Sequence, residues 1–274
     1  MKFTFVKMLA VITIIFFAAG FLSSGIAEGA DPTEFKVGME CAYAPFNWTQ
    51  TDDSNGAVPI SGGSFAAGYD IEIAKKIAEG LGMKLVVVKT EWDGLLPAIT
   101  SGKIDAIIAG MSPLPERLET IDFSDSYYTS DLVVVVKKDS SYANAKNLGD
   151  LSGARITAQL NTFHYSVIDQ IPGVKKETAM DDFPTMIVAL NAGKIDGYVS
   201  ERPGAVSASV SNPNISFIIF ENGFSYTAED ASIAVGLKKG SNLTTKINQI
   251  LAGISESERN TMMDTAVEQH PSFE

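Results

Sequence analysis

The stretch WDGLLPAITSGKIDAIIAGMSPLPERLETIDFSDSYY, Trp92 to Tyr128, decides how this chain folds. It predicts a short helix over 93–101 that ends at Gly102, a buried strand over 104–109, a polar turn, and a second short helix from Pro115. An apolar run between two glycines is typical of a strand that helices cover on both faces. Ligands of open α/β sheets bind beyond the carboxyl ends of such strands. We therefore expect a ligand at the turn that follows this strand.

Groups suited to an anion gather at that turn. Gly110 and Ser112 offer backbone N–H groups and a hydroxyl, and Arg117 offers a planar guanidinium that fits a carboxylate. A positive charge in the first turn of a helix is mildly unfavourable, which favours an anion nearby. The alternative is that Arg117 is a solvated cation paired with Glu116 or Glu119. The spacing alone leaves both interpretations open.

The helix-to-strand unit occurs twice. Residues 91–105 read EWDGLLPAITSGKID and residues 182–196 read DFPTMIVALNAGKID, at a constant offset of 91. An aromatic residue opens each copy, three apolar positions of one helical face match, and both copies end in Gly-Lys-Ile-Asp. Repeat arrays need at least three copies. Two copies therefore predict two lobes built on the same unit.

The second copy predicts the other half of the site. The offset maps the strand over 104–109 onto 195–200, and Gly110 onto Glu201. If the two crevices face each other, Glu201 lies opposite Ser112 and Arg117. A cation on one wall and an anion on the other suit a zwitterion, of which an amino acid is the common small example. The alternative is that Glu201 is a surface acid in contact with Arg202.

The segments before Trp92 predict further α/β units. Strands are expected over 35–39 and 85–88, and apolar residues at helical spacing predict a helix over 70–81 that ends at Gly82. Strands that alternate with helices predict a parallel sheet. The aromatic residues Tyr43, Phe46 and Trp48 follow the first strand, in a loop that runs without periodicity to Gly63. They form either a satellite core or the apolar wall of a cleft.

The remaining chain predicts where the lobes exchange segments. A strand over 130–136 leaves the first lobe, a new cycle begins at Ala154, and strands over 217–220 and 232–237 return the chain. Helical spacing over 243–267 predicts a helical pair packed on the first lobe. The expected division is a signal peptide over 1–27, lobe 1 over 32–130 plus 227–274, and lobe 2 over 131–226.

The N-terminus and the charge bound the location and the partners. A signal peptide cleaved after Ala27 or Gly29 is predicted by two lysines, the apolar run 8–22 and the small residues that follow it. The alternative is an uncleaved anchor, but the run is shorter than the ~20 residues that a membrane-spanning helix needs. Without residues 1–27, 19 basic and 33 acidic residues leave a net charge of −14, which argues against nucleic acid. The single cysteine, Cys41, excludes an internal disulfide. It lies beyond the apolar run, so we expect a buried thiol and no lipid anchor.

With these residues in place, the chain resembles the amino-acid-binding branch of the extracellular solute-binding proteins of ABC importers, family 3. The resemblance covers about residues 35–265. Its most specific parts are Gly68 to Ala74 (GYDIEIA), Trp92 to Gly110, Ser112 with Pro115-Glu116-Arg117, and Asp122-Phe123-Ser124 before Tyr127-Tyr128. It implies the type II periplasmic-binding-protein fold, in which two α/β lobes joined by two crossing strands close on one amino acid.

The resemblance also implies roles for individual residues. Arg117 would grip the α-carboxylate with help from Ser112 and Thr162, and Glu201 would take the α-ammonium with the Gly110 carbonyl. Tyr43 and Trp92 would enclose the ligand's side chain, and Phe46 and Phe163 complete the expected contacts. Glu40 occupies a position where members that select cationic side chains often carry an acid. The expected ligand is therefore arginine, lysine, ornithine or histidine.

The implied partners are a free amino acid and the membrane permease of an ABC importer, with the chain a periplasmic monomer. The sequence shows no metal-ligand cluster, phosphate-binding glycine loop or Ser/His/Asp arrangement, so we expect no cofactor, metal or catalytic residue. The rival class is a periplasmic enzyme on the same scaffold, such as a cyclohexadienyl or arogenate dehydratase, with His164 as its candidate acid or base. An exported sensor domain is a third class; no membrane span or signalling helix follows Val267.

Overall fold

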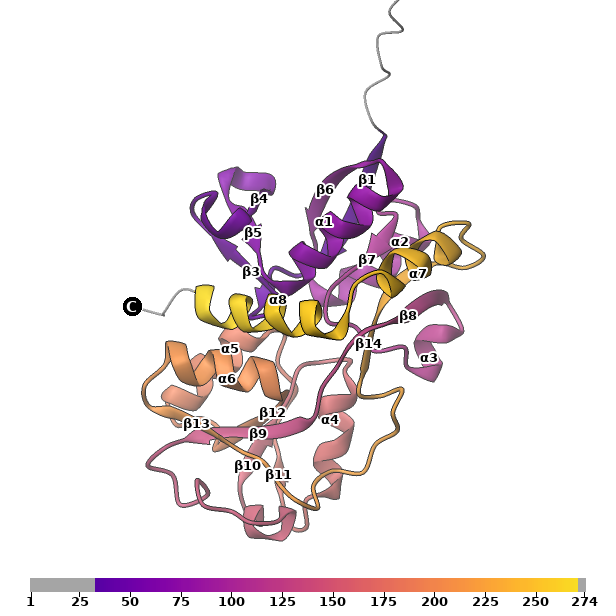
Figure 1. Cartoon of the computed structure of the whole chain (residues 1–274). Coiled ribbons are helices and arrows are strands. Elements are labelled where there is room, and N and C mark those ends of the chain that lie inside the picture. Colours follow the sequence, from indigo (N-terminus) through magenta and orange to yellow (C-terminus); the bar gives the residue numbers. More distant parts are fainter. Residues whose placement is uncertain (1–32, 271–274) are drawn as a thin grey trace, which may run out of the picture. The chain divides into compact units, whose positions relative to one another are not determined.

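Two five-stranded sheets organise the computed structural model, which describes residues 33–270. The first sheet has the order β6-β1-β7-β14-β8 and the second the order β11-β10-β12-β9-β13 (Figure 1). In the first sheet the strands are β1 (Glu34–Met39), β6 (Lys84–Lys89), β7 (Ala106–Ile107), β8 (Ile121–Thr129) and β14 (Ser232–Lys238). In the second they are β9 (Leu132–Lys137), β10 (Arg155–Thr157), β11 (Lys175–Lys176), β12 (Gly197–Glu201) and β13 (Ile215–Ile218). The two sheets make the fold two α/β lobes, as the sequence predicts.

The strands on which the prediction of a parallel sheet rests are parallel, but each sheet also contains antiparallel strands, so both sheets are mixed. β1 pairs in parallel with β6 and β7, and β10 pairs in parallel with β11 and β12. β14 runs antiparallel to β7 and β8, as β9 does to β12 and β13. The reason is the exchange between lobes. β8 continues after two residues into β9 of the second sheet, and β14 returns to the first sheet after β13.

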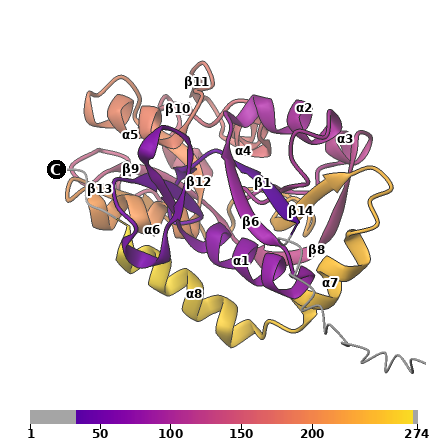
Figure 2. The same cartoon turned by 90° about the horizontal axis from the view of Figure 1, so that it is seen from above.

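The helices form where apolar residues recur every three or four positions. In α1 (Tyr69–Leu81) the isoleucines at 71, 73 and 77 are buried, and the helix ends at Gly82, whose φ of 67° suits a residue without a Cβ. α1 lies alongside β6 (Figure 2). Each fully buried aliphatic side chain contributes about 1.5–3 kcal/mol. The predicted helix over 70–81 is confirmed.

The other helices are short. They are α2 (Leu95–Thr100), α3 (Pro115–Leu118), α4 (Phe163–Val167), α5 (Phe183–Asn191), α6 (Arg202–Ser211), α7 (Thr244–Ala252) and α8 (Glu256–Gln269). The last helix differs from the prediction, because α8 packs against α6 of the second lobe as well as against α1. His270, which follows α8, lies 2.8 Å from the Ser211 hydroxyl of α6.

A third, four-stranded sheet lies where the sequence predicts an aperiodic loop. Its order is β2 (Ala42–Tyr43), β3 (Asn47–Gln50), β5 (Phe65–Ala67) and β4 (Val58–Pro59). Strands of two to four residues are too short to show alternation, and the turns between them hold three glycines with positive φ. Within residues 33–270, no helix is both long and apolar enough to cross a membrane. The predicted signal peptide lies outside the described residues.

Candidate functional site

Residues from both lobes line one small cavity, with a free volume of about 10 Å³. The lining residues are Tyr43, Trp92, Gly110, Ser112 and Arg117 from the first lobe, with Gln159, Thr162, Phe163, His164 and Glu201 from the second. They follow the carboxyl ends of β1, β6, β7, β10 and β12. Eight of these ten residues are ligand contacts that the sequence predicts. This free space is about that of one water molecule, so the two walls nearly meet here.

Arg117 is a buried cation in this cavity. Only 6% of it is exposed, and its guanidinium lies 5.2 Å from the centre of the Trp92 ring. Its two terminal nitrogens donate to the carbonyls of Ser112 and Asn161, each at 2.9 Å. Burial lowers the Arg117 pKa to about 10, which leaves it charged at neutral pH. The alternative of a solvated cation is wrong, and no carboxylate among residues 33–270 forms a salt bridge with it.

Glu201 is a buried acid that faces a buried histidine. It ends β12 and is 3% exposed, so it is not the surface acid of the alternative interpretation. Its Oε1 lies 3.2 Å from Nε2 of His164. Burial raises the pKa of Glu201 to about 8, and burial together with the Arg117 charge lowers that of His164 to about 3. The short distance therefore does not make an ion pair at neutral pH, because burial favours the uncharged form of both groups.

Unpartnered polar atoms converge on the cavity. Among residues 33–270, the buried side-chain atoms without a hydrogen-bond partner are the Tyr43 hydroxyl, both ring nitrogens of His164 and Oε2 of Glu201. All three residues line the cavity. Leaving a buried polar group unpaired costs about 1–3 kcal/mol, so such groups require a functional explanation. A ligand with donors and acceptors would satisfy them.

Glu40 and Gln159 form a bridge between the lobes beside the cavity. Glu40 follows β1, Gln159 lies two residues beyond β10, and the Gln159 amide donates to both Glu40 oxygens at 3.1 Å. Glu40 does not line the cavity, because Gln159 does so in its place. Burial, with the nearby charges of Asp182, Glu91 and Asp93, raises the Glu40 pKa to about 7. This end of the site is therefore acidic.

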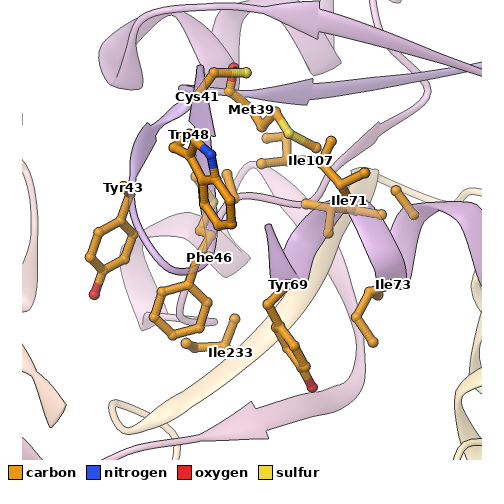
Figure 3. Close-up of a cluster of buried hydrophobic side chains, with 14 of the residues drawn as sticks. Met39, Cys41, Tyr43, Phe46, Trp48, Tyr69, Ile71, Ile73, Ile107 and Ile233 are labelled. Carbon is orange, nitrogen blue, oxygen red and sulfur yellow. The ribbon is translucent and has the colours of Figure 1, made fainter. Parts of the chain in front are cut away.

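Phe46 lies in the core and not at the cavity. It is fully buried, and its ring makes edge contacts with Tyr69 and Tyr128. Figure 3 shows it between Ile233 and Tyr43, whose ring centre lies 4.9 Å from its own. Phe46 therefore belongs to the main core and not to a satellite core, while Tyr43, which packs against it, forms part of the cleft wall. Cys41 is also buried, as expected, and burial raises its pKa to about 12.

The hydroxyls expected at the site already have backbone partners. Ser112 donates to the carbonyl of Asp230 at 2.8 Å, and Thr162 donates to that of Gln159 at 2.7 Å. Their oxygens remain available only as acceptors in this arrangement. A guanidinium has five N–H donors, of which Arg117 uses two in these bonds, so three remain for a ligand. Donation to an anion at this wall therefore falls mainly to Arg117.

Two lining residues, Gln159 and His164, are not among the ligand contacts that the sequence predicts. Gln159 occupies the place in the second lobe that Glu40 has in the first, since Ile156 and Val37 hold equivalent register positions against β12 and β7. A mapping of β10 onto β1 would have found it. The sequence offers His164 only as a candidate acid or base of the rival enzyme class.

A larger groove of about 320 Å³ lies between β2, β3 and helices α5 and α6. Its lining is mainly apolar, and its one charged side chain, Lys89, is exposed. The small cavity is the better candidate because a buried arginine, a buried acid and the unpartnered polar atoms meet there. Within residues 33–270, no cluster of three or more His, Cys, Asp or Glu residues could hold a metal ion.

Comparison with known proteins agrees with this geometry. Residues 35–265 match the model of the bacterial extracellular solute-binding proteins, family 3. The arginine-binding extracellular protein ArtP of Bacillus subtilis is 27% identical over 93% of both chains. A probable histidine-binding protein of Campylobacter jejuni is 30% identical over 86% of this chain and 84% of its own.

Solved structures are also similar. An amino acid ABC transporter substrate-binding protein, AbpA of Streptococcus pneumoniae, bound to L-arginine, matches with a TM-score of 0.73 and 26% identity. The match covers 86% of this chain and 94% of that one. An ancestral arginine-binding protein bound to arginine matches with a TM-score of 0.69 and 29% identity, over 84% of this chain and 96% of that one.

Proposed function

The chain belongs to the bacterial extracellular solute-binding proteins of family 3, and we propose that it captures an amino acid with a cationic side chain for an ABC importer. The family consists of binding proteins, so the chain is not an enzyme on this scaffold. It is exported, as the family is extracellular. Within this proposal it is a periplasmic monomer with a cleaved signal peptide over 1–27. Lobe 1 comprises 32–130 plus 227–274, and lobe 2 comprises 131–226.

The observation that carries the proposal is that one cavity brings together a buried cation and a buried acid that can ionise. Arg117 and Glu201 come from different lobes, both are buried, and neither has an oppositely charged protein partner that is ionised at neutral pH. A zwitterion supplies a carboxylate for the first and an ammonium for the second. Charge-assisted hydrogen bonds of this kind are about twice as strong as neutral ones.

Each lining residue then has a proposed role. Arg117 holds the α-carboxylate beside Ser112 and Thr162, and Glu201 holds the α-ammonium beside the Gly110 carbonyl. Tyr43, Trp92 and Phe163 enclose the aliphatic or aromatic part of the ligand's side chain. Binding of the ammonium ionises Glu201, because an opposite charge lowers a carboxyl pKa. His164 is then left as a neutral partner.

The class of side chain follows from the acids around Glu40. Asp182, Glu91 and Asp93 raise its pKa by like-charge repulsion, and a cation placed there relieves this repulsion. The relatives named for arginine and histidine, and the neighbours solved with arginine, bind ligands of this class. The Gln159 amide donates to both Glu40 oxygens, so Glu40 would exchange these hydrogen bonds for bonds from the cationic side chain of the ligand.

A thermal-shift screen of the protein without residues 1–27 tests the proposal. At pH 8, with each common amino acid and ornithine in about 100-fold excess over its dissociation constant, a true ligand adds roughly 2.7 kcal/mol of stability. We expect arginine, lysine, ornithine or histidine to raise the melting temperature, and aspartate and glutamate to have no effect. Absence of any shift would refute the amino-acid class. A shift with neutral amino acids alone would refute the cationic preference.

The Glu40→Gln variant is the matched control for side-chain class. It keeps the shape of residue 40 and removes its charge, so it should weaken the binding of cationic ligands and leave neutral ones unchanged. An unchanged ligand profile would show that Glu40 does not determine which side chains bind. The class of ligand would then rest on the comparisons alone.

A further inference from the structure

The segment GYDIEIA contains a buried acid that the cavity does not use. Asp70 is the second residue of α1, and its exposed fraction is 0%. It does not line the cavity, and no cation among residues 33–270 forms a salt bridge with it. Burying an unpaired charge is costly, and an apolar residue of similar size would avoid that cost. The position therefore requires another explanation.

One hydrogen-bonded arm runs from Asp70 to the loop after β7. The Tyr127 hydroxyl donates to Oδ1 of Asp70 at 2.7 Å and accepts from the backbone N–H of Gly110 at 3.3 Å. Gly110 lines the cavity with a φ of 61°, and a Cβ there would approach the Tyr43 ring to 3.0 Å. Tyr127 is itself fixed, because Tyr69 donates to its carbonyl at 2.9 Å.

A second arm runs from Asp70 to the loop after β1. The Asn47 amide donates to Oδ2 of Asp70 at 2.7 Å, and the Asn47 oxygen accepts from the backbone N–H of Cys41 at 2.7 Å. Cys41 has a φ of 56° and lies between Glu40 and the loop that carries Tyr43. Non-glycine residues rarely adopt this conformation, so the hydrogen bond from the Cys41 N–H to Asn47 helps hold the Cys41 backbone in it.

The two arms have the same geometry. Each joins Asp70 through one buried side chain to the N–H of a residue with positive φ. Each of those residues lies two or three positions beyond the end of a strand, β1 at Met39 and β7 at Ile107. These strands are parallel neighbours, so a single carboxylate connects the two loops that form much of the first-lobe wall. Burial raises the Asp70 pKa to about 6, while the hydrogen bonds that its carboxylate accepts from Tyr127 and Asn47 act to lower it.

We propose that Asp70 is a positioning residue for the ligand site. Through Tyr127 and Asn47 it sets the backbone at Gly110 and Cys41, and thereby the placement of Tyr43, Glu40 and the Gly110 carbonyl. The inference rests on the proposed function for its ligand, but its geometry is independent of any ligand. The first arm serves the α-amino end of the site, and the second serves the side-chain end.

Single substitutions separate the two arms. Tyr127→Phe removes the first arm and Asn47→Leu the second, and Asn47→Ala is the fallback if the leucine variant misfolds. Asp105→Asn is the matched control, because Asp105 accepts from the Lys36 N–H at the opposite end of β1. The variants are compared by amide hydrogen exchange without ligand and by isothermal titration with the amino acids that bind the wild type.

Exchange measures the positioning directly. The Ile108 amide, which donates to the Gly38 carbonyl, is the internal reference. We expect exchange at Gly110 to accelerate relative to Ile108 in Tyr127→Phe while Cys41 is unchanged, and the reverse in Asn47→Leu. Unchanged exchange at both amides would overturn the proposal, whatever the ligand.

Binding measures the consequence. Tyr127→Phe should weaken all ligands alike, by roughly tenfold, which corresponds to one hydrogen bond. Asn47→Leu should change the ratio of cationic to neutral ligands, and Asp105→Asn should change neither. Equal losses in all three variants would indicate general destabilisation and overturn the proposal. Failure of the wild type to bind any amino acid would refute the proposed function while the exchange result still stands.

Discussion

The unit at 91–105 and its second copy at 182–196 share the turn that follows the helix and the aspartate that precedes the next strand, and then diverge. Their helices begin differently, because the first opens with a 3₁₀ turn over Trp92–Gly94 before α2, whereas the second is the single α-helix α5. In each copy a helix ends at a glycine with positive φ, Gly102 at 77° and Gly193 at 67°. In each the final aspartate exchanges hydrogen bonds with the backbone of a neighbouring strand. Asp105 does so with Lys36, and Asp196 with Arg155, at 2.7–2.8 Å in both cases.

The register continues the correspondence into the sheets. Ala106 pairs with Val37, and the residue 91 positions later, Gly197, pairs with Ile156. Each central strand has a parallel neighbour on one side and an antiparallel strand from the exchange between lobes on the other. The Gly-Lys-Ile-Asp sequence thus has a structural cause, since it ends the helix and joins the next strand to its neighbour.

The copies differ in the residues that come after the strand. The first ends at Gly110, which contributes backbone only, and reaches its charge seven residues later at Arg117 in α3. The second ends at Glu201, which contributes a carboxylate at once and precedes α6. The repeated part therefore builds the scaffold, and the unrepeated part determines the chemistry. Opposite charges after two like units are what give the cavity its match to a zwitterion.

The largest expected effect comes from removing the charge of the first copy. Arg117→Ala should reduce affinity for every amino acid by about 2–5 kcal/mol, the usual cost of truncating one member of a buried charge pair. The unfolding free energy of the ligand-free protein should fall far less, because the variant also removes a buried cation without a carboxylate partner. Isothermal titration and urea denaturation measure the two quantities.

Arg202 is the control for that variant. It is the exposed arginine that follows Glu201 in the second copy, so Arg202→Ala should leave affinity unchanged. Equal losses for both arginines would mean that the charge after the first copy has no special role.

The charge of the second copy gives a smaller, pH-dependent effect. Glu201→Gln should weaken binding by about 1.5–3 kcal/mol, the range for hydrogen bonds to charged groups. Burial raises the Glu201 pKa to about 8, and only the ionised form attracts an ammonium. Wild-type affinity should therefore fall as pH decreases through this value, and the variant should show a flatter profile.

The free energy of unfolding of the ligand-free protein should change with pH in the opposite direction from ligand affinity. A folded-state pKa above the ordinary value of 4.5 means that protonation favours the folded, ligand-free form. The contribution of Glu201 is fully present below pH 4.5 and is lost as pH rises through about 8. Glu40 and Asp70 contribute with the same sign, so the difference between wild type and Glu201→Gln isolates residue 201. Thermal unfolding from pH 5 to 9 tests it, and parallel curves would contradict it.

Most of the residues that line the cavity could be predicted from the sequence, because the offset of 91 relates site positions of the two copies. The mapping of Gly110 onto the second copy predicts Glu201, and the position after a buried strand predicts Arg117. Gln159 is not predicted in this way, because β1 and β10 share no sequence pattern although they pair in the same register with β7 and β12. Short strands share too few residues for a repeat to be visible.

Other parts of the fold depend on contacts that leave no local pattern. Phe46 belongs to the core because Tyr69 and Tyr128 surround it, and neither is near it in sequence. The antiparallel direction of β14 depends on where the chain returns from the second lobe, which periodicity does not encode. Likewise, α8 reaches α6 through His270, and an amphipathic pattern does not say which lobe a helix covers.

The two aspartates at the ends of the copies, Asp105 and Asp196, should contribute different amounts to the free energy of unfolding. Asp196 accepts the Arg155 backbone N–H and also two side-chain nitrogens of Arg155, at 3.1 and 2.8 Å, whereas Asp105 accepts only the Lys36 N–H. Asp196→Ala should cost about 1–3 kcal/mol of unfolding free energy, and Asp105→Ala about 1 kcal/mol. Urea denaturation at pH 7 measures both.

The pH dependence checks the cause of that difference. Hydrogen bonds from Arg155 lower the Asp196 pKa below its ordinary 3.8, so this stability is present above pH 3.8 and is lost as pH falls below it. The gap between wild type and Asp196→Ala should therefore narrow in acid. A gap that persists at pH 3 would attribute the effect to packing and not to the carboxylate.

The same loss of stability is expected in both copies where they are most alike. Gly102→Ala and Gly193→Ala each place a Cβ in a left-handed conformation that costs roughly 1–2 kcal/mol. Nothing lies within 4 Å of the added atom at either position, so backbone strain is the only cost in both. Gly82 at the end of α1, also open with a φ of 67°, supplies a third measurement outside the repeat. Equal losses at all three positions, with unchanged ligand affinity, would show that the repeated turn is a generic helix stop. A larger loss at Gly102 alone would instead mean that the first copy also holds the loop of Gly110 in place, and the separation of scaffold from chemistry would not hold.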